Sequence, residues 1–198
     1  MYLKINLALV ALSFPLSFVL PPKVAFENGL IENLQVAVLL FSAALSFKLS
    51  LSAENSNSKW FHRFCAALMI LFAMRELSYG RVFFQTGAFP SGEPTFVMMA
   101  DFPYRKQIYI FLTIYILALL AILLKFIPLK RMLFGKKPVD ALIVMTVAIL
   151  VSQFGDHGYF VGKEYGAILE EVNELIAYMT FPKICLYYNE FFLNAKGV

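Results

Sequence analysis

The stretch "LIENLQVAVLLFSAALSFKL", residues 30–49, indicates the class of this protein. An α-helix rises about 1.5 Å per residue, so a run of this length crosses the roughly 30 Å hydrocarbon core of a bilayer. Four of its polar residues, Glu32, Gln35, Ser42 and Ser46, are spaced by three, seven and four positions, which keeps them on one side of a helix. Because such a stripe must face protein or water, the stretch predicts one member of a helical bundle.

The rest of the chain has the composition of an integral membrane protein. Hydrophobic residues make up 60% and charged residues 15%, with a mean hydropathy of +0.71. In soluble domains, about half of the residues are hydrophobic and about a quarter are charged. The predicted fold is therefore all-α, a polytopic membrane bundle of about six transmembrane helices. We expect residues 1–198 to form a single integral membrane domain, with spans at approximately 5–20, 30–49, 60–79, 107–127, 139–154 and 165–187.

The distribution of basic residues predicts the orientation. The segment "KFIPLKRMLFGKK", residues 125–137, carries five lysines and arginines between the fourth and fifth spans. By the positive-inside rule this loop and both termini face the cytoplasm. We expect the protein to lie in the cell's inner membrane. Anionic lipid headgroups account for the net charge of +4, so no nucleic-acid partner is expected. The long segment 80–106 then forms a folded outer loop.

Acidic residues gather on the other side of this predicted topology. Of the 13 acidic residues, only Glu54, Asp140 and Glu190 fall toward the cytoplasm. Acidic residues contribute little to orientation, so topology alone does not require this asymmetry. It predicts a shared polar site in the outer, extracytoplasmic half of the bilayer.

The sixth span supplies most of this site. In "GAILEEVNELIAY", residues 166–178, the side chains of Glu171, Glu174 and Tyr178 follow an i, i+3, i+7 pattern on one helix face. An ionised carboxylate inside a span is costly, so these residues need partners, water or protons. Arg75 and Arg81, near the outer end of the third span, are the expected counter-ions, because a guanidinium offers a planar fork to carboxylates or phosphates.

Several kinds of chemistry are excluded by residue counts and motifs. With two histidines, histidine-box di-iron sites and bis-histidine haem are not expected, and the sequence has no GxSxG, HExxH, Walker or CxxC motif. No cofactor is specified. Carboxylates do suit a hard divalent cation, for which Glu76, Glu171 and Glu174 are the candidate ligands.

Three functional hypotheses remain. The leading one is a small membrane-embedded enzyme that acts at the outer leaflet on a lipid or isoprenoid-linked substrate. Its predicted catalytic residues are Glu171, Glu174, His157 and Asp156, and its predicted substrate-binding residues are Arg75, Arg81, Glu32, Gln35 and Tyr178. In this hypothesis the arginines hold an anionic headgroup, and His157 with Asp156 moves protons.

The alternatives belong to other classes. One is an ion- or proton-coupled transporter with Glu174 and Glu32 on the ion path. The other is a non-catalytic assembly subunit of a membrane complex, in which Arg75 and Arg81 simply neutralise glutamates and fix helix register. Membrane lipids are expected partners throughout, and a membrane-protein partner belongs to the assembly hypothesis.

Overall fold

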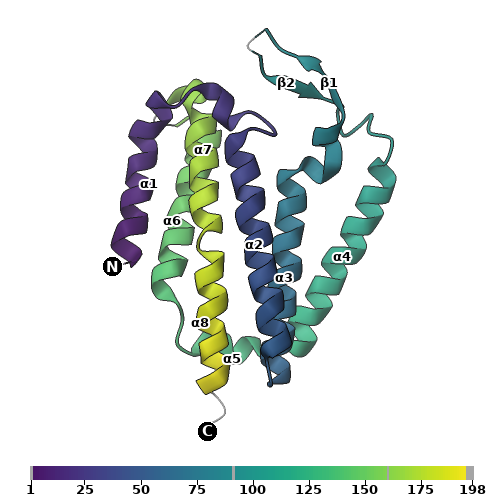
Figure 1. The fold of residues 1–198 in the computed structure, drawn as a ribbon, viewed down its shortest axis with the longest axis vertical. Helices are drawn as coiled ribbons and strands as arrows, with labels where there is room; N and C mark the ends of the chain where they lie inside the picture. Colours follow the sequence, from purple (N-terminus) through teal and green to yellow (C-terminus); the bar gives the residue numbers. More distant parts are fainter. Residues whose placement is uncertain (1, 91, 160, 195–198) are drawn as a thin grey trace.

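The computed structural model describes residues 2–90, 92–159 and 161–194, and leaves aside the side chains at 164 and 194. Most of the chain is helical (Figure 1). The elements, in order, are α1 (Tyr2–Val19), η1 (Pro22–Ala25), α2 (Leu30–Ser52), α3 (Ser56–Glu76), η2 (Ser78–Phe83), β1 (Gln85–Ala88), β2 (Pro94–Phe96), α4 (Arg105–Phe126), α5 (Leu129–Phe134), α6 (Val139–Asp156), α7 (Gly162–Tyr178) and α8 (Phe181–Asn194).

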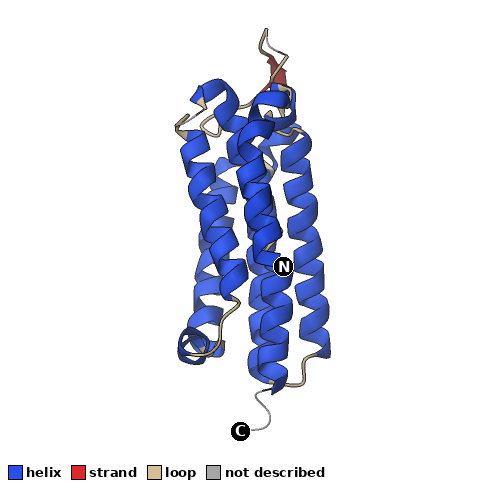
Figure 2. Ribbon diagram, turned by 90° about the vertical axis from the view of Figure 1, so that its left-hand side faces the viewer, coloured by secondary structure: helices blue, strands red, loops and turns tan. Residues whose placement is uncertain are grey.

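The long helices run along a common axis, as the side view shows (Figure 2). Helix α2 packs against α3, α6 packs against α7, and α1 lies on α6 and α7. Contacts of α2 with α7 and α8 join the two groups, while α4 lies against α3. The start of α1 and the end of α8 both point away from the β1–β2 hairpin (Figure 1).

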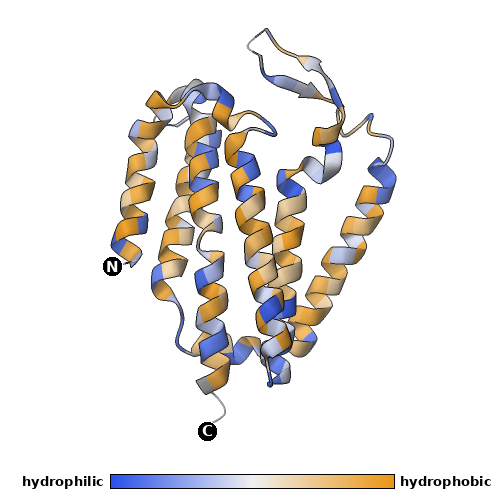
Figure 3. Ribbon diagram, in the orientation of Figure 1, coloured by the Kyte–Doolittle hydropathy of each residue, from blue (hydrophilic) through white to orange (hydrophobic). Residues whose placement is uncertain are grey.

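Four segments are long and apolar enough to cross a membrane. The first is α1 and the second is residues 22–52, which include α2. The third and fourth are α4 and α6. Hydrophobic residues predominate along these helices, with hydrophilic residues mostly near the ends (Figure 3). On helix α4, the exposed fractions of Ile110, Ile114 and Leu124 are 62 to 74%. An apolar surface of this kind is unfavourable in water and favourable against lipid chains. Helices α3, α7 and α8 lie beside them in the same bundle.

The predicted span 165–187 is not one helix. Helix α7 ends at Tyr178 and α8 begins at Phe181, so two residues separate them. Pro182 explains the break, because it has no N–H for the helix ladder and its ring clashes with the carbonyl four residues earlier. The Thr180 hydroxyl donates to the Ala177 carbonyl at 2.7 Å, which satisfies part of the exposed end of α7.

The predicted outer loop contains a small antiparallel sheet, which the all-α prediction lacked. Strands β1 and β2 pair with Gln85 opposite Phe96 and Ala88 opposite Pro94. Before them, Tyr79 and Gly80 have φ of 54° and 90°, and this left-handed conformation turns the chain sharply after α3. The hairpin therefore projects from the end of the bundle where α3 ends (Figure 1).

Helix α6 approaches α7 closely enough to fix their relative position. An added Cβ at Gly155 would lie 2.7 Å from both the Gly166 carbonyl oxygen and the Glu170 backbone nitrogen. A glycine is required at such a crossing because backbone lies directly against backbone. Below it, Ala148 is fully buried in a cluster with Ile176.

Candidate functional site

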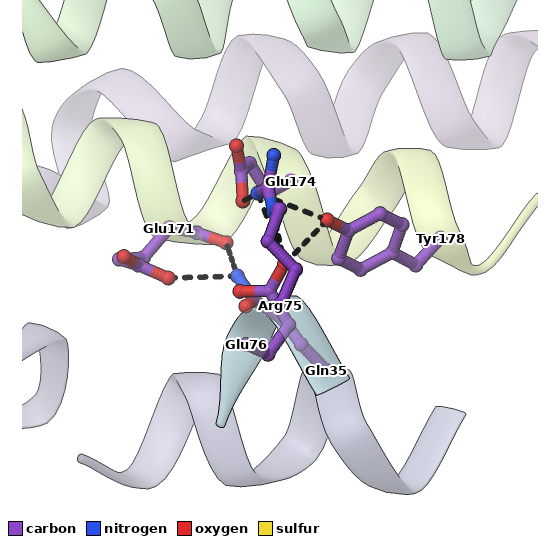
Figure 4. Close-up of polar contacts among 6 residues, drawn as sticks. All are labelled: Gln35, Arg75, Glu76, Glu171, Glu174 and Tyr178. Atoms are coloured by element: carbon purple, nitrogen blue, oxygen red, sulfur yellow. Dashed lines mark hydrogen bonds and ion pairs between the residues drawn. The ribbon is translucent and has the colours of Figure 1, made fainter. Parts of the chain in front are cut away.

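Arg75 lies at the centre of a network of polar side chains near the end of α3 (Figure 4). Its Nε donates to Glu76 Oε1 at 3.0 Å, and its Nη2 donates to Glu174 Oε2 at 2.7 Å and to Tyr178 Oη at 3.2 Å. We call Arg75, Glu76, Glu174 and Tyr178 the Arg75 network. The guanidinium thus joins α3 to α7 through charge-assisted hydrogen bonds, which are stronger than neutral ones.

Glu76 is the most buried acid of this network. It is 7% exposed, and it also accepts a hydrogen bond of 2.7 Å from the Tyr178 hydroxyl. Removing a carboxylate from water is costly unless it is paired and hydrogen-bonded, and Arg75 and Tyr178 meet both needs. The side chain of Arg75 is 49% exposed and that of Glu174 is 16% exposed, so the network has a buried side and an accessible side.

Two further predicted residues meet one turn away. Gln35 of α2 donates its Nε2 to the Glu171 carboxylate at 2.8 Å and to the Glu171 carbonyl at 2.9 Å (Figure 4). Glu32 instead accepts a hydrogen bond of 2.5 Å from the backbone N–H of Asn28, where it supports the first turn of α2. Glu171 therefore faces α2, whereas Glu174 faces α3.

A pocket of about 360 Å³ lies beside the network, between α3, α6, α7 and α8. We call it the apolar pocket. Its volume is at the lower end of the range for small-molecule sites. Arg75, Glu174, Tyr178, Ser152 and Gln153 give it a polar part, and its remaining lining is apolar: Leu68, Phe72, Met145, Ile149, Ala177 and Phe181.

Three stacked aromatic rings form part of the pocket wall. Phe72, Tyr178 and Phe181 have centroid separations of 5.9 to 6.2 Å and interplanar angles of 17 to 23°. Offset stacking of this kind adds to the area that each ring buries. It also holds the Tyr178 ring in place, and with it the hydroxyl that donates a hydrogen bond to Glu76.

The structure places three other predicted residues away from the Arg75 network. Asp156 and His157 lie at the end of α6 with side chains 57% exposed, 3.6 Å apart, and His157 stacks on Tyr159. Arg81 pairs with Glu27. This pair lines a separate, larger hollow of about 630 Å³ beside the β1–β2 hairpin. The roles predicted for these residues stay predictions.

The predicted metal site receives no support from the geometry. Among the residues described, no group of three or more His, Cys, Asp and Glu side chains is arranged to hold a metal ion. The three candidate ligands bond other residues instead. Glu76 and Glu174 accept hydrogen bonds from Arg75, and Glu171 accepts one from Gln35. A divalent cation stays a prediction.

The sequence predicted neither Ser152 nor Gln153, the two polar residues that α6 contributes to the apolar pocket. Ser152 is 1% exposed, and its hydroxyl has no hydrogen-bond partner in the described part of the chain. The sequence offered no signal, because a serine within an apolar helix ordinarily donates to a carbonyl of its own helix. Ser13, Ser42 and Ser50 do this.

The chain was compared with protein-family models, curated proteins and solved structures, and no match was found in any of the three comparisons.

Proposed function

We propose that this protein is a membrane-embedded enzyme that binds a lipid-like amphiphile in the apolar pocket and acts on it with Glu174. One observation carries the proposal: the apolar pocket ends at an ion-paired carboxylate and a phenol. Ligand sites typically combine an apolar lining with a few convergent polar groups. An amphiphile has the matching division into an apolar chain and a polar head.

The apolar wall suits a hydrocarbon chain. Leu68, Phe72 and Phe181 offer it only carbon, as does Ile149. Each buried methylene contributes about 0.8 kcal/mol when it leaves water. A hydrocarbon chain that enters the pocket from the bilayer gains less free energy than one that enters from water, because it is already in apolar surroundings. In a membrane, the selectivity of the pocket must therefore come from its polar end.

Glu174 is the best candidate for proton transfer at that end. Arg75 bonds its Oε2, while Oε1 accepts no hydrogen bond from any described residue. One carboxylate oxygen is thus held in position and the other remains available to a ligand in the pocket. A general base needs this combination of fixed geometry and hydrogen-bond reach. Arg75 is a positioning residue in this scheme, and Tyr178 holds Glu76.

We further propose the topology on which the site's location depends. In it, the chain crosses the inner membrane six times, with α7 and α8 together forming the last crossing. Both termini and the basic segment 125–137 face the cytoplasm, in line with the positive-inside rule. The Arg75 network then lies in the outer half of the bilayer, because α3 ends there.

The contacts of α2 favour an enzyme over an ion path. The polar stripe of this helix includes Ser42, whose hydroxyl donates to the Val38 carbonyl, and Ser46, whose hydroxyl donates to Cys185 Sγ. Both hydroxyls already have partners within the protein and offer little to a passing ion. The stripe is therefore better explained by helix packing.

The pocket is tested by blocking it. Ile149 and Leu150 are neighbours on α6 and similarly exposed, at 46% and 53%, but only Ile149 lines the pocket. Ile149→Trp should reduce the amount of lipid that mass spectrometry detects with the purified protein, and Leu150→Trp should not. Equal retention in the two variants would remove the pocket from the proposal.

The chemistry is tested with Glu174→Gln. The amide keeps the shape of the side chain but cannot take up a proton at neutral pH. The variant should be as stable as the parent, while the lipid composition of cells that produce it shifts toward an accumulating substrate. If lipid composition is unchanged and the variant is at least as stable, the glutamate is structural and the assembly hypothesis replaces the enzyme.

A further inference from the structure

We infer that the amphiphile carries a neutral, hydroxyl-bearing head. This inference rests on the proposed function, because it assumes that the apolar pocket holds an amphiphile. It differs from the anionic headgroup that the arginines suggested in the sequence. Two independent observations carry it, the charge balance of the Arg75 network and the unpartnered hydroxyl of Ser152.

The charge balance disfavours an anionic head. Arg75 contacts two carboxylates, Glu76 and Glu174, at 2.9 and 2.7 Å. With both acids ionised the three groups sum to one negative charge, and with one protonated they sum to zero. A phosphate would therefore meet no net positive charge, even at the Arg75 Nη1, which donates to none of the described residues. Arg81, the other arginine, is paired with Glu27 at the separate hollow.

Ser152 supplies the second observation. Its hydroxyl is buried at the apolar pocket and lacks a partner among the residues described. Leaving a buried hydroxyl unpaired is unfavourable. The other buried serines of α1 and α2 avoid this by donating to a carbonyl of their own helix or, for Ser46, to Cys185 Sγ. A polar group of a bound molecule would satisfy Ser152.

The polar groups together match a hydroxyl. Glu174 Oε1 accepts a hydrogen bond and cannot donate one while ionised, Ser152 both donates and accepts, and the Gln153 amide does both. An alcohol head can donate to the carboxylate and still accept from the serine or the amide. A phosphate head, which at neutral pH is mainly an acceptor, leaves Glu174 without a donor and adds repulsion.

The inference is tested with three probes of equal chain length: 1-monododecanoylglycerol, dodecyl phosphate and dodecylamine. The full-length protein in nanodiscs is given an equimolar mixture, and native mass spectrometry measures which probe remains bound. We expect the glycerol ester to be retained at least about tenfold over the phosphate. Ile149→Trp should lower retention of all three probes.

Ser152→Ala then isolates the hydroxyl. One neutral hydrogen bond corresponds to roughly a two- to tenfold change in affinity. Retention of the glycerol ester should therefore fall by that factor, and by more than retention of the phosphate, which Glu174 repels from this end of the pocket. Ser152→Thr should restore it. The alanine variant removes an unpartnered polar group and should fold as well as the parent.

Each other outcome has a defined meaning. Equal or stronger retention of dodecyl phosphate or dodecylamine overturns the neutral-head inference and leaves the pocket proposal standing. Retention of no probe, or of all three equally in the parent and in Ile149→Trp, overturns the proposed function itself. Equal loss of all probes in Ser152→Ala assigns the serine to pocket shape and removes the second observation.

Discussion

Replacing Arg75 by methionine tests the Arg75 network most directly. The change keeps a long side chain but removes the guanidinium that bonds Glu76, Glu174 and Tyr178. Breaking a fully buried ion pair by removing one partner costs about 3 to 5 kcal/mol. Arg75 is 49% exposed, and Glu76 keeps its bond from Tyr178. We therefore expect a smaller loss in the free energy of unfolding, about 2 kcal/mol.

A double-mutant cycle shows whether this loss comes from a stranded carboxylate. In the parent, Glu76→Gln should lower the free energy of unfolding by no more than about 1 kcal/mol, because the amide oxygen still accepts the hydrogen bond from Tyr178. In the Arg75→Met background the same change should stabilise the protein, because it removes the unpaired buried charge. The opposite signs are the expected signature of coupling between the two residues.

The assay is unfolding of the purified protein by sodium dodecyl sulfate in mixed micelles, followed by circular dichroism, for the parent, both single variants and the double variant. If Arg75→Met lies within about 0.5 kcal/mol of the parent, or the two changes are additive, Glu76 does not depend on Arg75.

The remaining predictions concern helix packing and topology. Gly155→Ala should lower the free energy of unfolding by about 1 to 3 kcal/mol, although alanine is the better helix former, because its Cβ would meet the Gly166 carbonyl. As a control, Leu150→Ala at an exposed position should lower it by less than about 1 kcal/mol. Equal losses would contradict the close approach of α6 and α7. A cysteine at Thr86 should react with an impermeant thiol reagent from outside and one at Ser56 only after permeabilisation, with the buried native cysteines silent. The reverse pattern would invert the proposed orientation.

Long apolar runs made most helices predictable. The second span, predicted at 30–49, is α2 (Leu30–Ser52), and the fourth, predicted at 107–127, is α4 (Arg105–Phe126). Hydropathy changes sharply at charged flanks, so it locates such helix ends within a few residues. It failed at the last span because Tyr178 and Phe181 lie in equally apolar surroundings. The signal for the break was Pro182, a local steric effect that hydropathy does not measure.

Part of the site was also predictable. Arg75 was expected to neutralise a glutamate because an arginine inside a span needs a partner, and its contact with Glu174 is present. The sequence left open which glutamate this would be, since Glu171 and Glu174 share a helix face, and only the positions of α2 and α3 separate them. Ser152 and the stacked aromatic wall had no sequence signal, because pocket-lining residues resemble other residues of apolar helices.

The two roles of the Arg75 network differ in how they depend on its members. Helix α7 packs mainly against α6, α1 and α2, whereas α3 packs against α2, α4 and α8, so side chains form much of the link between α3 and α7. Arg75 takes part in both bonds to carboxylates, and its loss must disturb stability and site together. Glu174 takes part in one, and the Tyr178–Glu76 bond remains without it. A change at Glu174 therefore separates function from folding, and a change at Arg75 does not.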